Sequence, residues 1–185
     1  MNRVAGIFIE AGCALGGSSI VLAGAKSIER RLFCYDVFGM IPKPGEEDGL
    51  EVYERYSVIS SGKSEGLNGE IYYGYRDDLL TDVKMSFQKF GFPIDDNNIN
   101  LIKGLYEDTL VVNEPVAFAH IDCDWYASVK LCLERIYPFL AKGAILVIDD
   151  YYYYSGCKKA VDEFLCQRKG EFSIFEKSRL HLIRR

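Results

Sequence analysis

Short apolar runs alternate with longer helical stretches along most of the chain, and this alternation constrains the fold more than any other feature. The strand-like runs cover residues 6–10, 31–36, 98–104, 116–122 and 144–150. The helical stretches between and after them cover residues 18–29, 77–92, 128–143 and 157–170. Such alternation is typical of a mostly parallel sheet with helices on both faces. The sequence therefore predicts a doubly wound α/β fold.

The remaining segments are expected to complete one domain that spans residues 1–185. Between residues 39 and 77 the periodicity weakens, because glycine, proline, serine and acidic residues dominate there. We predict a long loop insertion at about 39–77, with one short helix in it. Two short runs at 172–177 and 179–185 are typical of a terminal antiparallel hairpin.

Two helix ends can be predicted from capping residues. Serine is a favoured N-cap, so Ser18 or Ser19 is expected to begin the first helix. Glycine is favoured just beyond a helix, so Gly143 is expected to end the helical stretch at 128–143.

Charge and hydropathy exclude two kinds of partner. The 185 residues include 27 acidic and 22 basic side chains, which gives a formal net charge of -5. With no basic stripe to neutralise phosphates, nucleic acid is not an expected partner. The apolar runs fall far short of the roughly 20 residues that a membrane span needs, and Glu10 and Gly12 interrupt any signal-peptide core. We therefore expect a cytoplasmic protein without a membrane partner.

The cysteines are expected to be buried, reduced thiols. The chain has six of them, at positions 13, 34, 123, 132, 157 and 166, and none forms a Cys-x-x-Cys pair. Four fall in predicted strands or helices, where cysteine behaves as a small apolar residue. With only two histidines in the chain, a histidine-rich metal site is not expected either.

Acidic side chains end four of the predicted strands. In doubly wound sheets, ligands bind outside the carboxyl ends of the strands, near the point where the strand order reverses. The sequence therefore places a ligand site at this edge. Its acidic residues are Glu10, Asp36, Asp122, Asp149 and Asp150.

The turn after the first strand is rich in glycine. Gly12, Gly16 and Gly17 would allow a backbone to approach a ligand closely. Neither a G-x-G-x-x-G pattern nor a P-loop is present, so a simple tight turn is an equal alternative. Asp36 strengthens the ligand interpretation, because an acid about 20 residues after such glycines suits the two hydroxyls of a ribose. A capping or solvated Asp36 is the alternative.

Three of the acids predict a metal site. Asp122, Asp149 and Asp150 would repel one another at one sheet edge unless a cation compensated them. Carboxylate oxygens suit Mg²⁺ or Ca²⁺, with open positions for water or substrate oxygens. The alternative is that one or two of these acids cap the helices that follow.

Several neighbours of the acids have open roles. Asp124 would accept a proton if it faces the pocket. His120 is expected to be satisfied locally, and Trp125 either covers a flat ligand or closes the core. The four tyrosines at 151–154 follow the acidic pair directly, where a loop must face the ligand side. We expect them to form a substrate or partner surface, with at least one packed in the core.

Five segments together resemble the macrocin-type sugar O-methyltransferases. They are "IEAGCALGGSS", "FCYDVFGMIPKP", "LIKGLYEDTL", "HIDCDWYAS" and "ILVIDDYYYYSGCKKAVDEF". They occur in the order and spacing of that family between residues 6 and 168. The resemblance implies a Mg²⁺-dependent O-methyltransferase that uses S-adenosylmethionine, built on a seven-stranded sheet that ends in an antiparallel hairpin.

The resemblance also implies roles for individual residues. The methionine part of the cofactor would contact Glu10, Gly12, Gly16, Gly17, Ser18 and Ser19. The ribose would contact Asp36, and the adenine would lie near Gly104, Leu105 and Tyr106. The metal would be held by Asp122, Asp149 and Asp150, and Asp124 matches the family's proposed general base. The acceptor would be a hydroxyl of a glycan or glycosylated small molecule.

Departures from the family leave the acceptor open. Family members usually carry a helical segment before the first strand, which helps to build the dimer, whereas here the strand starts almost at Met1. A homo-oligomer is compatible with the sequence. Two rival functions remain: a Mg²⁺-dependent phosphoryl-transfer or hydrolytic enzyme, with Lys158 and Lys159 as its cations, and a cofactor-binding partner subunit without catalysis.

Overall fold

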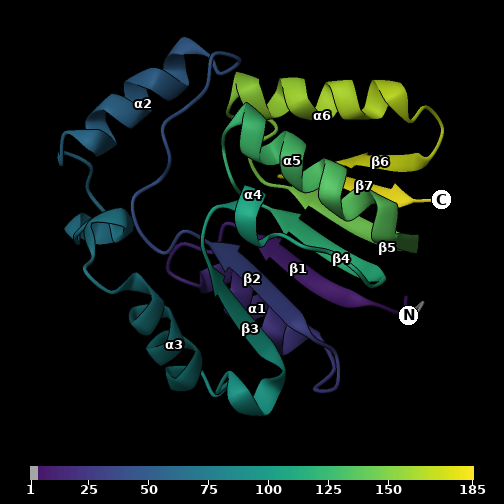
Figure 1. Cartoon of the computed structure of the whole chain (residues 1–185), viewed down its shortest axis with the longest axis horizontal. Helices are drawn as coiled ribbons and strands as arrows, with labels where there is room; N and C mark the ends of the chain where they lie inside the picture. Colours follow the sequence, from purple (N-terminus) through teal and green to yellow (C-terminus); the bar gives the residue numbers. More distant parts are fainter. Residues whose placement is uncertain (1–3) are drawn as a thin grey trace.

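The computed structural model describes residues 4–185, and its centre is one seven-stranded sheet (Figure 1). The strand order is β3-β2-β1-β4-β5-β7-β6. The first five strands in this order are parallel, and β7 pairs antiparallel with both β5 and β6. The predicted doubly wound sheet with a C-terminal hairpin is confirmed. The strands are β1 (Ile7–Ala11), β2 (Leu32–Asp36), β3 (Ile99–Lys103), β4 (Val116–Ile121), β5 (Leu140–Ile148), β6 (Phe172–Glu176) and β7 (Leu180–Arg184).

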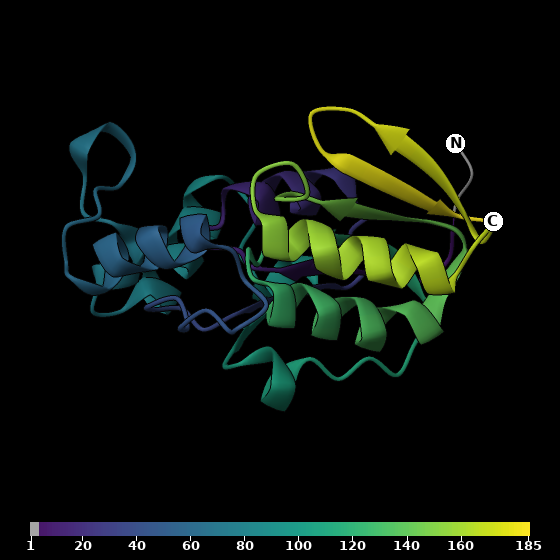
Figure 2. The ribbon, with the colours of Figure 1, turned by 90° about the horizontal axis from the view of Figure 1, so that it is seen from above.

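Helices cover both faces of the sheet (Figures 1 and 2). The α-helices are α1 (Gly17–Ala25), α2 (Leu50–Ser60), α3 (Leu79–Lys89), α4 (Tyr106–Thr109), α5 (Tyr126–Ile136) and α6 (Ser155–Gln167). Helices α1 and α3 pack on one face, against β2 and β3. Helices α5 and α6 pack on the other, against β1, β4 and β5. Because helices cover both faces of the sheet, the sequences of β4 and β5 are nearly continuous apolar runs.

The helix predicted at 128–143 ends earlier than expected, and this boundary was wrong. Helix α5 ends at Ile136, a 3-10 turn covers Tyr137–Phe139, and β5 begins at Leu140. Pro138 lies in that turn and has no N–H to continue an α-helix. Gly143 lies inside the strand with φ +81°, close to an irregularity in the pairing of β4 with β5. The glycine thus marks a bulge in a strand.

The serine cap predicted for α1 was also wrong. The N-cap is Gly16 in a left-handed conformation, and it makes no side-chain cap. Ser19 is fully buried, and its hydroxyl donates to Glu10 at the end of β1. The serine connects a helix to a strand end, and this long-range contact overrides its local capping preference.

The segment 39–77 contains more regular structure than expected. It includes the eleven-residue helix α2 and two 3-10 turns, Leu67–Gly69 and Tyr73–Tyr75. Helix α2 and the residues after it lie beyond the carboxyl ends of the strands (Figure 2). The segment therefore borders the edge where the sequence places the ligand site.

All six thiols are free, and burial is confirmed for five of them, whereas Cys166 is exposed and the prediction was wrong there. Within residues 4–185, no helix is both long and apolar enough to cross a membrane.

The carboxyl ends of β1 and β4 approach each other so closely that Gly12 cannot carry a side chain. Its φ is +90°, and a Cβ there would overlap the carbonyl oxygen of Asp122. We expect Gly12→Ala to lower the free energy of unfolding by roughly 3 kcal/mol or more, because a strained φ and a backbone clash combine. Urea unfolding measures this. The control is Gly17→Ala, where a Cβ meets nothing within 4 Å, and an equal loss in both variants would contradict the argument.

Candidate functional site

The acids that end the strands converge at one edge of the sheet, as predicted. Backbone hydrogen bonds fix the strand ends relative to one another. Gly12 N–H donates to the Tyr35 carbonyl at 2.9 Å, and Asp122 N–H donates to the Ala11 carbonyl at 2.8 Å. Asp149 N–H donates to the Ile121 carbonyl at 3.0 Å. The acids of β1, β2, β4 and β5 therefore sit on a rigid scaffold around the point where the strand order reverses.

A cavity of about 150 Å³ opens at this edge, between β1 and β4 and the loops around them. One wall carries six predicted site residues, which are Gly12, Asp36, Leu105, Tyr106, Asp122 and Asp124. Trp125 and Ser128 at the start of α5 complete that side. Residues 39–45, here called the roof, also contribute to the lining, through Gly39, Ile41, Pro42, Lys43 and Gly45. A pocket at the switch point with a few convergent polar groups is the expected form of a cofactor site.

Asp36 is held by three backbone N–H groups. Cys13 and Ala14 donate to its Oδ2 at 2.9 and 3.0 Å, and Phe38 donates to its Oδ1 at 2.7 Å. Burial raises the pKa of Asp36, and the three N–H groups counteract that shift. Asp36 thus fixes the loops after β1 and β2 around the cavity, and its carboxylate still lines the cavity wall.

Glu10 lies deeper than the cofactor role suggests. It is fully buried and does not line the cavity. Its Oε2 accepts from the hydroxyl of Ser19, and its Oε1 lies 2.9 Å from Nδ1 of His120. Glu10 therefore acts in this structure as a link between β1, α1 and β4. The other predicted cofactor residues outside the cavity wall are Gly16, Gly17, Ser18, Ser19 and Gly104.

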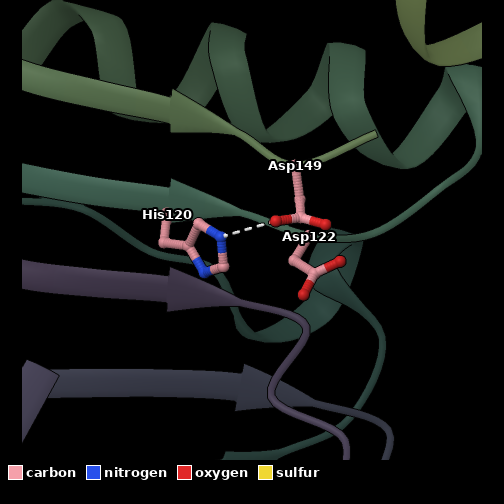
Figure 3. Close-up of side chains that lie close together, drawn as sticks. All are labelled: His120, Asp122 and Asp149. Carbon is pink, nitrogen blue, oxygen red and sulfur yellow. Dashed lines mark hydrogen bonds and ion pairs between the residues drawn. The ribbon is translucent and has the colours of Figure 1, made fainter. Parts of the chain in front are cut away.

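Two groups of side chains have the spacing of metal ligands. His120, Asp122 and Asp149 form one group, shown in Figure 3, and the ligand atoms in it lie within 4.8 Å of one another. The second group consists of Asp122, Asp124 and Asp150 and has the same spacing. Asp122 belongs to both groups, and the four aspartates together form the acid cluster.

The acid cluster concentrates negative charge in a buried setting. Burial, with repulsion from Asp149 and Asp150, raises the pKa of Asp122 to about 8. Burial and the charge of Asp150 raise the pKa of Asp124 well above its usual range, and burial also raises the pKa of Asp150. Such shifts mark carboxylates that lack a compensating cation, and they cluster at functional sites.

Asp149 is the exception in the acid cluster. Burial alone would raise its pKa, but hydrogen bonds from His120 and Arg179 lower it. Nε of Arg179 lies 2.5 Å from Asp149 Oδ1, and Nε2 of His120 lies 3.4 Å from the same atom. Burial would lower the pKa of His120, but Asp149 and Glu10 raise it to about 10. Both contacts to Asp149 use Oδ1, which leaves Oδ2 for another ligand.

The chemistry of this donor set fits a hard divalent cation. Oδ2 of Asp150 is buried and has no hydrogen-bond partner among the described residues, which is costly for a carboxylate. Carboxylate oxygens are the ligand type that Mg²⁺ prefers, and at Asp149 only Oδ2 is open, because His120 and Arg179 share Oδ1. Of the three predicted ligands, Asp149 lies with Asp122 in the group that contains His120, and Asp150 lies with Asp122 in the group that contains Asp124. Asp122 and Asp124 also line the cavity.

Some functional neighbours were not assigned from the sequence. Arg179 lies in the turn before β7, and no local pattern pairs it with Asp149, 30 residues away. His120 is satisfied by protein partners, as expected, but those partners are the two acids Glu10 and Asp149. The roof could have been found by topology alone, because it follows the carboxyl end of β2.

The aromatic residues divide between packing and exposure. Trp125 is only 3% exposed, and its ring packs edge-on against Tyr154 while the residue lines the cavity. Tyr151 and Tyr154 are half-buried against the core, whereas Tyr152 and Tyr153 are exposed. The prediction that at least one of the four packs in the core is confirmed, and two exposed rings remain for a surface.

Fold and site together define a class: a doubly wound α/β protein with a cavity at the switch point and an acid cluster in its wall. The profile of the Macrocin-O-methyltransferase (TylF) family matches residues 1–176. The chain belongs to this family.

Two curated relatives are similar to this chain over most of its length. Demethyldecarbamoylnovobiocin O-methyltransferase of Streptomyces niveus is 27% identical over 175 residues, which cover 88% of this chain and 59% of the relative. A second relative is 8-demethyl-8-(2,3-dimethoxy-alpha-L-rhamnosyl)-tetracenomycin-C 4'-O-methyltransferase of Streptomyces olivaceus. It is 28% identical over 179 residues, which cover 94% of this chain and 61% of the relative. The chain thus spans about three fifths of the length of both relatives.

The solved structures show the same fold. The O-methyltransferase NovP superposes with a TM-score of 0.78 at 24% identity, over 99% of this chain and 73% of NovP. The calicheamicin methyltransferase CalS11 superposes with a TM-score of 0.67 at 16% identity, over 97% of this chain and 72% of CalS11.

The raised pKa of Asp122 predicts how stability depends on pH without metal. Its ordinary pKa of 3.8 rises to about 8 in the folded chain. Between these values the folded state retains a proton that the unfolded state releases, so the free energy of unfolding falls as pH rises from about 4 to 8. We expect Asp122→Asn to show a smaller fall, because asparagine does not titrate. Urea unfolding in chelator at pH 5 and pH 8.5 measures the difference, and parallel pH profiles would refute it.

Proposed function

We propose that this chain is an O-methyltransferase domain that uses S-adenosylmethionine and a divalent cation, preferably Mg²⁺, to methylate a hydroxyl of a sugar or glycosylated small molecule. The observation that carries the proposal is the position of the acid cluster. Asp122 and Asp124 stand in the wall of the same cavity that Gly12 and Asp36 line. Cofactor and acceptor hydroxyl can therefore meet at one place. Membership of the family and the names of the relatives support the reaction class.

The cavity suits the cofactor in shape and polarity. Gly12 lines the cavity, and its lack of a side chain lets the Asp122 carbonyl pack directly against it. Asp36 offers a carboxylate to ribose hydroxyls, and Leu105 and Tyr106 offer apolar surface to a flat base. When bound, S-adenosylmethionine would supply an electrophilic methyl group, and the roof and Trp125 would exclude water from it.

The acid cluster would prepare the acceptor. When held by Asp122, Asp149 and Asp150, a divalent cation would lower the pKa of a nearby hydroxyl as a Lewis acid. Asp124 would take the hydroxyl proton at a carboxylate oxygen. This transfer is a modest task once the cation has acidified the hydroxyl. Positioning of the acceptor oxygen in line with the methyl group would supply much of the remaining rate.

The two lysines named for the phosphoryl-transfer alternative pair away from the acids, and the cation that does reach them, Arg179, is engaged by Asp149. Lys158 pairs with Asp162 at 2.6 Å, and Lys159 pairs with Glu47. Both lysines are thus engaged by carboxylates outside the acid cluster. In the methyl-transfer reaction no phosphate has to be neutralised, so the absence of a nearby lysine is not a deficit.

Filling the cavity should abolish cofactor binding without unfolding the chain. Gly39 lines the cavity, and a Cβ there would meet only the Val37 carbonyl oxygen at 3.9 Å. We expect wild type to bind S-adenosylhomocysteine with micromolar affinity in calorimetric titration, and Gly39→Trp to bind at least about 100-fold more weakly. Gly39→Ala is the control and should bind as wild type does. No binding by wild type would remove the methyltransferase proposal for this chain alone and favour a partner-dependent subunit.

The general-base role of Asp124 predicts a separation of binding from chemistry. We expect Asp124→Asn to bind S-adenosylhomocysteine within about threefold of wild type, but to transfer methyl groups at least about 100-fold more slowly, as loss of a general base does. Transfer of a tritiated methyl group to a panel of glycosides with free sugar hydroxyls measures this. Retention of the wild-type rate would exclude Asp124 as the base.

A further inference from the structure

Carboxylates from one distant segment cap the helices that follow the acid cluster. Neither α5 nor α6 has a side-chain cap from its own N-cap residue. Instead, Asp48 Oδ1 accepts from the N–H of Tyr126 at 2.8 Å, and Glu51 Oε1 accepts from the N–H of Ser155 at 3.0 Å. Both acids thus satisfy N–H groups that would otherwise lack a partner at the start of a helix.

The Asp48 contact lies next to the predicted base. Tyr126 is the second residue after Asp124, and Asp124 has φ +56°, a left-handed conformation that is strained for a residue with a side chain. Such a conformation persists only where the surroundings fix it. Asp48 is 8% exposed, and its bond to Tyr126 holds the chain directly after the strained turn.

The same carboxylate also holds the roof. Asp48 Oδ2 accepts from the N–H of Gly45 at 2.9 Å, so one side chain joins the roof to α5. A second contact runs in parallel, because the indole N–H of Trp125 donates to the Pro42 carbonyl at 2.9 Å. Asp48 therefore connects two elements that both line the cavity, the roof and the start of α5.

Gly156 shows that the surroundings are built for this carboxylate. A Cβ on Gly156 would overlap Asp48 Oδ1 and would lie 3.3 Å from the Cβ of Tyr126. Alanine has a better helix propensity than glycine, so the glycine near the start of α6 has no advantage for the helix itself. Its advantage is the space that it leaves for Asp48.

We propose that Asp48 is a positioning residue, which holds the roof of the cavity against α5 and fixes the turn that carries Asp124. The cofactor part of this inference rests on the proposed function. The docking of the roof against α5 does not depend on the cofactor, because the bonds that hold it lie within this chain. Because the roof lines the cavity, we expect loosening of the Asp48 contacts to speed release of the cofactor.

The test uses the single tryptophan of the chain as its reporter. Trp125 is the only tryptophan, and its indole bonds directly to the roof. Two variants weaken the Asp48 contact from opposite sides: Asp48→Asn removes its charge, and Gly156→Ala displaces it. Lys159→Ala is the control, because it removes an exposed ion pair with Glu47 and a cation–π contact with the Tyr126 ring but leaves both hydrogen bonds of Asp48 in place. Emission wavelength, acrylamide quenching and S-adenosylhomocysteine dissociation are measured well below the unfolding temperature.

We expect both variants to fold, to show red-shifted and more readily quenched Trp125 emission, and to release S-adenosylhomocysteine about tenfold faster, as loss of a charge-assisted hydrogen bond would cause. Lys159→Ala should match wild type in all three. Unchanged emission and quenching in both variants would overturn the proposal. Unfolding of both would also overturn it, because the roof would then not be separable from the fold. If wild type binds no cofactor, the proposed function fails, while the fluorescence arm still decides the role of Asp48.

Discussion

The mutual repulsion of buried carboxylates at the carboxyl edge of the sheet is the constraint on which the rest of the structure depends. Asp122, Asp124 and Asp150 lie close together, and burial raises the pKa of each. A flexible chain would separate such groups. Here the close approach of β1 and β4 at Gly12 and the backbone bonds between strand ends prevent this separation. Holding these carboxylates together therefore lowers the stability of the fold, but it places them where they can bind a cation next to a hydroxyl.

Features that depend on a regular repeat could be predicted from the sequence. Strand and helix periodicities established the order of elements, and parallel topology then required acids at strand ends to meet. Asp36 and Asp122 were located in this way, since each directly follows an apolar run. Both line the cavity. This inference needs only the direction of the strands, so errors of a few residues at helix ends do not affect it.

Features that depend on contacts between distant residues could not be predicted. Asp48 and Tyr126 are 78 residues apart, and Glu51 and Ser155 are 104 residues apart. Rules based on local sequence consider only residues next to a helix end, so they cannot find a cap that comes from so far along the chain. The same reason explains Ser19, whose hydroxyl serves Glu10 in a neighbouring element. The boundary at Ile136 was missed because Gly143 resembles a helix end, although it lies inside a strand.

The acids at this edge differ in the groups that compensate their charge. This difference distinguishes the acids that hold the fold together from those that are free to bind a ligand. Backbone N–H groups satisfy Asp36, and Ser19 with His120 satisfies Glu10. His120 and Arg179 share one oxygen of Asp149. At Asp150, by contrast, a buried oxygen has no protein donor in residues 4–185. The carboxylate oxygen without a donor therefore lies in the acid cluster, close to Asp122 and Asp124 in the cavity wall. A cation placed there would relieve the repulsion and adjoin the acceptor at the same time.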